Sequence, residues 1–580
     1  MLCERDAKEW GNFYSYFGIT VDTNVNKTKD EDRKQCYQKD VVYGTVEAFA
    51  ADHLRQIFEM KDVRPDRDYQ CVIIDEVDSL LLDQGVQHTY LSSPMVSMQH
   101  LNIVLAMIWG HVSQYGILST GCETFIQGPP ASFYKAIFDS IDSDENEIDD
   151  PTDILQIAEV LEIVPGGFTK NIFQKGKDEI LEDLKTVSQD AALRFFQEME
   201  HYVPYGFTVY TLDDNGLLRL SKTSTCEPNI PELKFLVLDG GLCCSLYDSE
   251  KIVSNAIAEL ISVKIQYTPS TNHNTDRISV PGFLRNLIET RISVWVQNAF
   301  LAMRLRQGRE YVVENDRVIP VDFKSTGIVE LSKKWGDGLQ QFVEMKHQVK
   351  LSTISTVTNY LSNMSLFQMY HGKIFGTTGT LGNDTDIEFL QNLFQNLSTL
   401  RMPTFNRRKL FEVEGSVKTS VQEWKSEIKD VVKTQISPNS YRGGRAVLVI
   451  CETINMAKEI SEDLETIRPR DIKLYCRSDK DGLNKINEEL LPGDVIVATN
   501  LAGRGTNIQV SPEVNSNGGL QVILSFLSQN TRVELQAFGR TARKGKPGSA
   551  QIIMCTSHLQ ETFGAVSSLE EAKMTRCRRS

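Results

Sequence analysis

Two acidic residues stand directly after a short apolar run near the start of the sequence. Cys-Val-Ile-Ile occupies residues 71–74, and Asp75 and Glu76 follow it. The pattern predicts a short buried strand that ends at the two acids. Paired carboxylates at the carboxyl end of such a strand are where a nucleotidase holds Mg²⁺ and orients a water molecule. Asp75 would hold the metal and Glu76 would polarise the attacking water. The alternative is a strand that meets an ordinary acidic turn.

A glycine-rich segment follows another apolar run in the last third of the sequence. Residues 494–500 predict a second buried strand, and Gly503, Arg504, Gly505 and Thr506 come after it. Small residues behind a strand let backbone amides approach a phosphate closely, with a basic side chain beside them.

Two arginines complete the set of residues that could act on a phosphate. Arg540 and Arg543 are three residues apart, so a helix would direct both guanidinium groups from one face. Arginines that reach a γ-phosphate from a second domain contribute about 10³–10⁵ in rate in nucleotidases. The alternative is that the two arginines simply belong to the solvated surface of a helix, as basic pairs on helices usually do. Each element is a weak signal alone, but the three in this order are a strong one.

These motifs belong to a longer series that runs nearly from end to end of the chain. The series comprises residues 4–7, 43–45, 52–55, 74–79, 334–339, 376–380, 499–506 and 539–549. Together they resemble the motor portion of the SecA family, ATPases that push secretory proteins through a membrane channel. The run Gly-Arg-Thr-Ala-Arg-Lys-Gly-Lys-Pro-Gly-Ser at 539–549 is specific to this family among helicase-like motors. The region from about 92 to 304 resembles the family poorly.

The resemblance implies an α/β fold with two RecA-like parallel-sheet domains that bind ATP and Mg²⁺ between them. The first domain is expected to be N-terminally incomplete and to carry a mixed helical and β insertion. The expected segments are 1–91 for the partial first domain, 92–345 for an insertion that resembles the preprotein cross-linking clamp, 346–402 for the return of the first domain, and 403–580 for the second domain.

The resemblance also assigns roles to individual residues. The implied catalytic residues are Asp75, Glu76, Arg540 and Arg543, with Asp75 holding Mg²⁺ through water. The implied nucleotide-binding residues are Gly503, Arg504, Gly505, Thr506, Asn507 and Gln536, and the implied coupling residues are Gly376, Thr378, Gly379 and Thr380. Asn507 stands where the family usually has an aspartate. An amide keeps the hydrogen bonding but loses the charge, which casts doubt on nucleotide-dependent coupling.

The phosphate cradle Gly-x-x-x-x-Gly-Lys-Ser/Thr is not found in the 580 residues. In SecA-like motors it lies upstream of the position that matches Met1, and the helical scaffold and wing domains lie beyond the position that matches Ser580. Loss of the central cradle strand would leave unpaired edges in the first sheet. Three explanations stay open: an incomplete gene model, a cradle supplied by another chain, or a pseudo-enzyme.

Composition restricts the partners. Hydrophobic residues make up 41% and charged residues 24% of the chain, as in ordinary soluble proteins. The net charge of −15 argues against a nucleic-acid partner. Eleven cysteines without a Cys-x-x-Cys pair argue against zinc. With no long apolar stretch and no signal peptide, a cytoplasmic protein that contacts a membrane peripherally is expected. The implied partners are an unfolded polypeptide or preprotein client and a membrane translocation channel.

The sequence also predicts individual elements. These are strands at 17–21, 41–43, 446–450, 495–498, 520–524 and 551–554, helices at 46–60, 154–164, 178–199 and 281–305, and a hairpin at 309–321 that turns at Asn315 and Asp316.

Two other functions are open. A nucleic-acid helicase of the same superfamily predicts a basic face and a short interval between Asp75 and Gly376, whereas this chain is acidic and the interval is several hundred residues. A peptide-binding or scaffold protein that kept the clamp and lost the motor is supported directly by the missing cradle.

Overall fold

The chain forms two compact units in the computed structural model. The structure describes residues 2–25, 27–64, 67–94, 96–120, 123–141, 152–170, 187–201, 206–214, 216–223, 232–269, 277–322, 328–329, 334–394, 397–438, 443–467, 472–476, 488–499, 508–528, 530–563, 566 and 568–579. The first unit comprises residues 1–95, 305–335 and 355–580, and the second comprises residues 96–304 and 336–354. This division is coarser than the four segments expected from the sequence, whose boundaries stay predictions.

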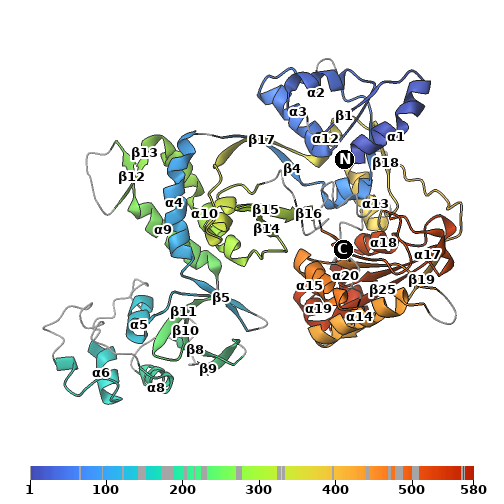
Figure 1. Ribbon diagram of the computed structural model, residues 1–580. Coiled ribbons are helices and arrows are strands. Elements are labelled where there is room, and N and C mark those ends of the chain that lie inside the picture. The colour runs from blue at the N-terminus through green and yellow to red at the C-terminus, as the bar shows by residue number, and fades with distance from the viewer. Residues whose placement is uncertain are drawn as a thin grey trace. The chain divides into compact units, whose positions relative to one another are not determined.

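The N-terminal part of the first unit alternates helices and short strands (Figure 1). Its elements are α1 (Leu2–Tyr16), β1 (Val21–Asn24), α2 (Asp30–Tyr37), β2 (Val41–Gly44), α3 (Val46–Phe58), β3 (Val72–Asp75), the π-helical turn η1 (Ser79–Asp83) and β4 (His88–Pro94), joined later in the chain by β17 (Ser355–Ser362), α12 (Asn363–Gln368), β18 (Ile374–Thr377) and α13 (Asp384–Leu393).

The strands of this part form three separate pairs among the described residues. β1 pairs with β2 and β3 pairs with β18, both in parallel, while β4 and β17 form an antiparallel ribbon. Ile73 and Phe375 are register partners in the β3–β18 pair, and their side chains are 76% and 63% exposed. Parallel sheets normally have both faces covered, so this exposed apolar face is unusual.

The C-terminal part of the first unit is built on one parallel sheet. Its strands are β19 (Lys409–Glu412), β20 (Ser416–Lys418), β21 (Val447–Cys451), β22 (Lys473–Tyr475), β23 (Val495–Thr499), β24 (Leu520–Leu524) and β25 (Pro547–Cys555). The order is β19-β25-β24-β21-β23-β22, with β20 also paired to β25, and every pairing is parallel. The predicted α/β class with parallel sheets is confirmed.

Helices cover both faces of this sheet, as its continuous apolar strands require. They are α14 (Val421–Ile436), α15 (Ile454–Glu465), α17 (Pro512–Ser516), α18 (Thr531–Phe538), α19 (Thr556–Phe563) and α20 (Leu569–Arg579), with a short 3₁₀ turn, η6 (Arg543–Gly545). One core packs α14 and α15 against the sheet, and the other lies on the side of α17 to α20. The strands β21, β23 and β24 are buried throughout.

A small antiparallel sheet also belongs to the first unit. It consists of β14 (Tyr311–Glu314), β15 (Arg317–Asp322) and β16 (Ile328–Val329). Asn315 and Asp316 join the first two strands with φ angles of 49° and 56°, as a two-residue hairpin turn requires. The hairpin predicted at 309–321 is therefore confirmed, turn residues included.

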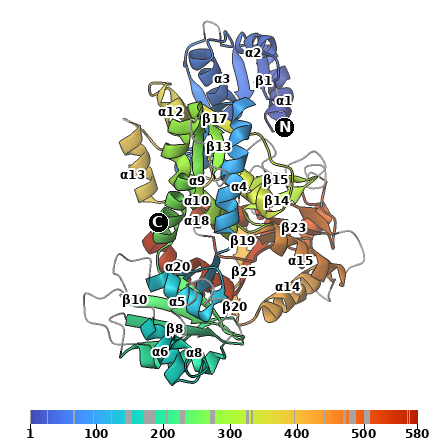
Figure 2. The same cartoon turned by 90° about the vertical axis from the view of Figure 1, so that its left-hand side faces the viewer.

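The second unit combines a helical group with a mixed sheet (Figure 2). Its helices are η2 (Val96–His100), α4 (Leu101–Val112), α5 (Phe133–Ile141), α6 (Thr152–Val160), α8 (Gln189–Met199), α9 (Glu250–Lys264), η4 (Gly282–Leu284), α10 (Arg285–Arg304) and α11 (Leu339–Lys346). Its strands are β5 (Gly116–Ser119), β6 (Thr124–Gln127), β7 (Ala131–Ser132), β8 (Gly206–Leu212), β9 (Leu218–Thr223), β10 (Glu232–Val237), β11 (Leu242–Tyr247), β12 (Ile265–Thr268) and β13 (Ile278–Pro281). Helices α4, α9 and α10 pack side by side, and α5, α6 and α8 share a core with the sheet.

Most predicted elements are confirmed within a few residues, and two predictions are wrong. The strand expected at 17–21 begins only at Val21, because the chain turns at Phe17 and Gly18, where φ is +71°. The strand that ends at Asp75 exists, but only Ile74 in it is buried, because nothing described covers its other face. Residues 178–186 of one predicted helix lie outside the described residues.

None of the described helices is both long and apolar enough to cross a membrane.

The thiols give a direct test of the packing in the first unit. Cys36 and Cys476 are buried, and burial is the main cause that raises the pKa of each thiol to about 12. Cys71 is exposed. A thiol with a pKa near 12 is about 10⁻⁴ thiolate at pH 8, so it alkylates very slowly. We expect iodoacetamide to modify Cys71 in the native protein and Cys36 and Cys476 only after denaturation, as read by peptide mass spectrometry. Equal labelling of Cys36 and Cys71 in the native protein would contradict this packing.

Candidate functional site

The two predicted acids lie at the carboxyl end of the β3–β18 pair. Asp75 is the last residue of β3, and its Oδ1 accepts hydrogen bonds from the backbone N of Glu76 at 3.1 Å and from Thr377 Oγ1 at 3.3 Å. Glu76 has a φ of 51°, in the left-handed region. Residues other than glycine rarely adopt this conformation, and such strain concentrates at functional sites. The conformation of the turn therefore fixes the points at which the side chains of Asp75 and Glu76 leave the backbone.

Gly376 allows β18 to approach this turn. A Cβ at Gly376 would lie 2.7 Å from Val77 Cγ2, closer than real Cβ atoms come to a neighbour. Gly379 has open space around the position of a Cβ. Of the two predicted coupling glycines, only Gly376 is thus required by packing.

Asp78 joins the predicted coupling residues to α18. Its Oδ1 accepts from Thr378 Oγ1 at 2.8 Å, and its Oδ2 accepts from Thr380 Oγ1 at 3.0 Å and from Gln536 Nε2 at 3.1 Å. Gln536 Nε2 also lies 3.0 Å from Thr380 Oγ1, and the Asp78 carboxylate is fully buried. Three predicted residues from two distant motifs therefore meet at one carboxylate that carried no predicted role.

A second contact of α18 lies one helical turn from the contact between Gln536 and Asp78. Arg532 is buried in the first turn of α18, and its Nη2 lies 2.5 Å from Asp83 Oδ1 while its Nη1 lies 3.3 Å from Asp386 Oδ1. Asn530 donates from Nδ2 to the same Asp83 oxygen at 3.3 Å. A cation at a helix N-terminus is disfavoured by the helix dipole, so the two carboxylates also offset that effect.

The prediction of one helix through both arginines is wrong. Helix α18 ends at Phe538, and Ala542 has a left-handed φ of 56°, so Arg540 and Arg543 do not share a helical face. Arg540 is buried and Arg543 is exposed. Desolvation lowers the pKa of Arg543, and the negative charge of Glu76 acts in the opposite direction, so these two predicted catalytic residues interact electrostatically.

Another buried ion pair attaches the middle of α18 to α20. Arg576 of α20 lies with Nη1 2.7 Å from Glu534 Oε2 and donates to the backbone O of Ser528. Glu534 stands between Arg532 and Gln536 in the sequence, so a short stretch of α18 carries three anchored polar side chains.

The predicted phosphate-binding segment cannot be placed. Gly503, Arg504, Gly505, Thr506 and Asn507 lie outside the described residues.

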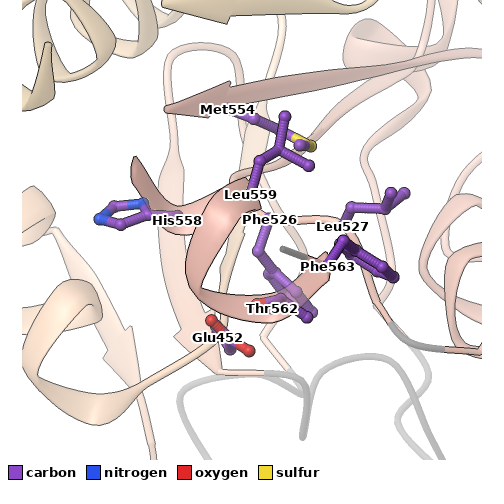
Figure 3. Close-up of a pocket in the computed structure, with 8 residues that line it drawn as sticks. All are labelled: Glu452, Phe526, Leu527, Met554, His558, Leu559, Thr562 and Phe563. Carbon is purple, nitrogen blue, oxygen red and sulfur yellow. The ribbon is translucent and has the colours of Figure 1, made fainter. Parts of the chain in front are cut away.

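A small cavity at the carboxyl ends of β21, β24 and β25 is not a nucleotide site. It is lined by Glu452, Phe526, Leu527, Met554, His558, Leu559, Thr562 and Phe563 (Figure 3). Its volume of about 10 Å³ holds roughly one water molecule. Most of the lining is apolar, so this cavity belongs to the packing of α19 on the sheet.

Asp78, Asp83 and Arg532 are the site residues that the sequence did not reveal. One signal was present: Arg532 and Gln536 are four residues apart, which places both on one face of a helix. Nothing in the sequence paired that face with the acids after β3, because the partners are several hundred residues away.

Comparison with known proteins agrees with these motifs. Residues 1–390 match the family model described as the SecA DEAD-like domain. The chain belongs to this family. The acids after β3, the hub at Asp78 and the segment carrying Gly376 all lie within the part that matches the SecA DEAD-like model.

The relatives of this SecA-family chain are longer proteins. The protein translocase subunit SecA of Chlorobium luteolum is 25% identical over 97% of this chain and 52% of its own length. The protein translocase subunit SecA of Chlamydia trachomatis is 24% identical over 95% of this chain and 55% of its own length. The chain thus spans about half the length of these relatives. A solved structure of apo XPD covers 94% of this chain and 84% of its own at 12% identity, but the TM-score of 0.30 carries no argument.

Proposed function

We propose that the protein is a SecA-like motor that uses ATP to move a polypeptide client through a membrane channel. The observation that carries the proposal is the group formed by Asp78, Thr378, Thr380 and Gln536, which ties the acidic turn to the helix before the arginines. Through such a contact, a change in the nucleotide bound at Asp75 and Glu76 can alter the position of α18 in the C-terminal part of the first unit. Family membership supports the same conclusion.

The residues present suit Mg²⁺ and a triphosphate. Mg²⁺ is usually held by one or two carboxylates together with substrate phosphates, and Asp75 is an exposed carboxylate at the carboxyl end of a parallel strand. When bound, MgATP supplies a transferable γ-phosphoryl group. Asp75 would hold the metal through water, and Glu76 would orient the attacking water and accept its proton. Arg543, Arg540 and Arg504 would stabilise the negative charge on the phosphates.

The coupling residues would act without touching the nucleotide. The Asp78 carboxylate holds Gln536 and both threonines at once, so a shift of the acidic turn displaces α18 through hydrogen bonds already formed. Arg532 with Asp83 gives the same helix a second point of attachment. These are positioning residues rather than catalytic ones.

A peptide-binding protein without a motor is the second candidate. The exposed apolar face of Ile73 and Phe375 favours it. Such a protein would bind an unfolded client equally well with and without nucleotide.

One experiment separates the two candidates. The native protein, purified from its own cells, is assayed for ATP hydrolysis with and without an unfolded polypeptide, and binding of a fluorescent unfolded polypeptide is measured in parallel with ATP, ADP or no nucleotide. Hydrolysis that rises with the client and binding that depends on nucleotide support the motor. Client binding with no hydrolysis and no dependence on nucleotide would replace the motor by the second candidate.

A further inference from the structure

Thr377 lies directly opposite the carboxylate that was predicted to hold a metal ion. It is the last residue of β18 and the register partner of Asp75, the last residue of β3. Its Oγ1 donates to Asp75 Oδ1 at 3.3 Å, and both side chains are exposed at the carboxyl end of the strand pair. No role was predicted for Thr377, although Gly376 and Thr378 on either side of it were assigned to coupling. The hydroxyl at this place therefore needs an explanation of its own.

The two oxygens of the Asp75 carboxylate have different partners. Oδ1 accepts from the backbone N of Glu76 at 3.1 Å as well as from Thr377, whereas Oδ2 accepts no hydrogen bond from the residues that the structure describes. The last torsion of an aspartate side chain is broad, so a carboxylate with one donor can turn over a wide range. A second donor on the same oxygen narrows that range. Thr377 thereby helps to occupy Oδ1 and leaves Oδ2 as the oxygen that can accept from a further group.

The neighbouring threonines hold a different acid. Thr378 and Thr380 donate to the two oxygens of Asp78, which is fully buried. The hydroxyls of residues 377–380 are thus divided between two acids of the same turn, with two on the buried acid that contacts α18 and one on the exposed acid. Because the two acids are held by different side chains, Thr377 can be changed while the contacts of Asp78 stay in place.

We propose that Thr377 is a positioning residue for the divalent metal, because it holds the Asp75 carboxylate so that Oδ2 accepts from a water molecule bound to Mg²⁺. Mg²⁺ keeps several of its waters and demands near-ideal octahedral geometry, so a carboxylate that contacts it through water has to be well oriented. Outer partners that orient a metal ligand typically contribute about 10–100-fold to metal affinity. The inference rests on the proposed function, since it needs the metal at Asp75, and it adds a residue to that site.

A purely structural role explains the hydroxyl of Thr377 less well. β3 and β18 are already paired in parallel along their whole length, and Val72 N donates to Lys373 O at 3.1 Å where the pair begins. Gly376 packs closely against Val77 at the other end. One further hydrogen bond between two exposed side chains adds little to this pairing, because water competes for both groups. What the hydroxyl adds beyond the pairing is a second donor on the carboxylate.

The test is the affinity of the full chain for Mn²⁺, a paramagnetic substitute for Mg²⁺. Electron paramagnetic resonance measures the free ion, so the readout does not depend on ATP turnover. We expect Thr377→Val to weaken Mn²⁺ binding by about tenfold, the lower end of the range for an outer partner, because Asp75 contacts the metal through water. Valine has nearly the same shape and suits a strand, so the β3–β18 pair should persist. Thr377→Ser keeps the hydroxyl donor and should bind Mn²⁺ within about threefold of the unmodified chain.

Two further variants make the result specific. Asp75→Asn removes the charge of the metal ligand itself, so the Mn²⁺ site that this variant loses is the site under test. Thr419→Val is the matched control, because the exposed Thr419 also donates its hydroxyl to a carboxylate, that of Glu423 at 2.6 Å on α14. This control should leave the affinity for Mn²⁺ unchanged. Circular dichroism and the temperature of thermal unfolding of each variant report whether the fold is kept.

The outcomes separate this inference from the proposed function. Weaker Mn²⁺ binding in Thr377→Val, with recovery in Thr377→Ser, supports the inference. Unchanged affinity in Thr377→Val while Asp75→Asn loses the site would overturn the role of Thr377 and leave the metal at Asp75 in place. Equal affinity of Asp75→Asn and the unmodified chain would remove the metal from Asp75 and contradict both. Equal loss in Thr377→Val and Thr377→Ser, together with a lower unfolding temperature, would assign Thr377 to the structure of the strand pair instead.

Discussion

Glu76→Gln is expected to lower ATP turnover by about 10²–10⁴-fold, the usual contribution of a general base. The amide keeps the shape and the left-handed backbone of residue 76 but can no longer accept a proton. ADP affinity should stay within about twofold, because the proposed contact of Glu76 is with water and not with the nucleotide. Steady-state hydrolysis and equilibrium titration with a fluorescent ADP analogue measure the two quantities on the same preparation.

The matched control is Glu388→Gln, which makes the same chemical change on the exposed side of α13. Turnover in this variant should equal that of the unmodified protein. If Glu76→Gln retains full turnover while Glu388→Gln behaves as expected, Glu76 is not the base and the assignment at the end of β3 fails.

Arg532→Met is expected to weaken the attachment of α18 to the N-terminal part of the first unit. Removal of one partner from a buried ion pair costs about 3–5 kcal/mol. Asp386 keeps a side chain that is 31% exposed, and Asp83 one that is 15% exposed, so water compensates part of the loss. We therefore expect a loss of roughly 2 kcal/mol, which makes the amides of residues 533–538 exchange with solvent about 30-fold faster. Hydrogen exchange followed by mass spectrometry reports this segment directly.

A double-mutant cycle with Asp83→Asn isolates the contact itself. If the pair carries the effect, the double variant should exchange little faster than either single variant. Arg285→Met provides the control, because Arg285 forms an exposed pair with Glu289 that should contribute under about 1 kcal/mol. Unchanged exchange of α18 in Arg532→Met would mean that the ion pair does not hold the helix.

The sequence predicted those parts of the fold that local pattern determines. β21, β23 and β24 are continuous apolar runs, and their complete burial follows from that pattern. Asn315 and Asp316 suit a turn that needs two left-handed residues, so the hairpin could be predicted with its turn. Asp75 and Glu76 were singled out because paired carboxylates at the end of a strand suit a metal ion and a water molecule in a nucleotidase, with an ordinary acidic turn as the alternative.

The rest depends on partners that local pattern does not contain. An apolar run at 71–74 predicts burial, but Ile73 is exposed because β3 pairs only with β18 among the described strands. The spacing of Arg540 and Arg543 predicts a shared helical face, but the backbone leaves the helix at Gly539. Asp78 stood within the recognised acidic motif, yet its role became visible only when Gln536 was found beside it.

Arg532 and Gln536 lie one helical turn apart, so α18 is attached to the acidic turn at two points. Both side chains leave the same face of one rigid helix, and their acceptors lie on one short turn, with Asp78 directly before η1 and Asp83 at its end. Once one contact has formed, the other forms at a high effective concentration, because the helix has already lost its freedom to tumble. The two contacts should therefore form and break cooperatively, and intermediate states with only one contact should be scarcely populated.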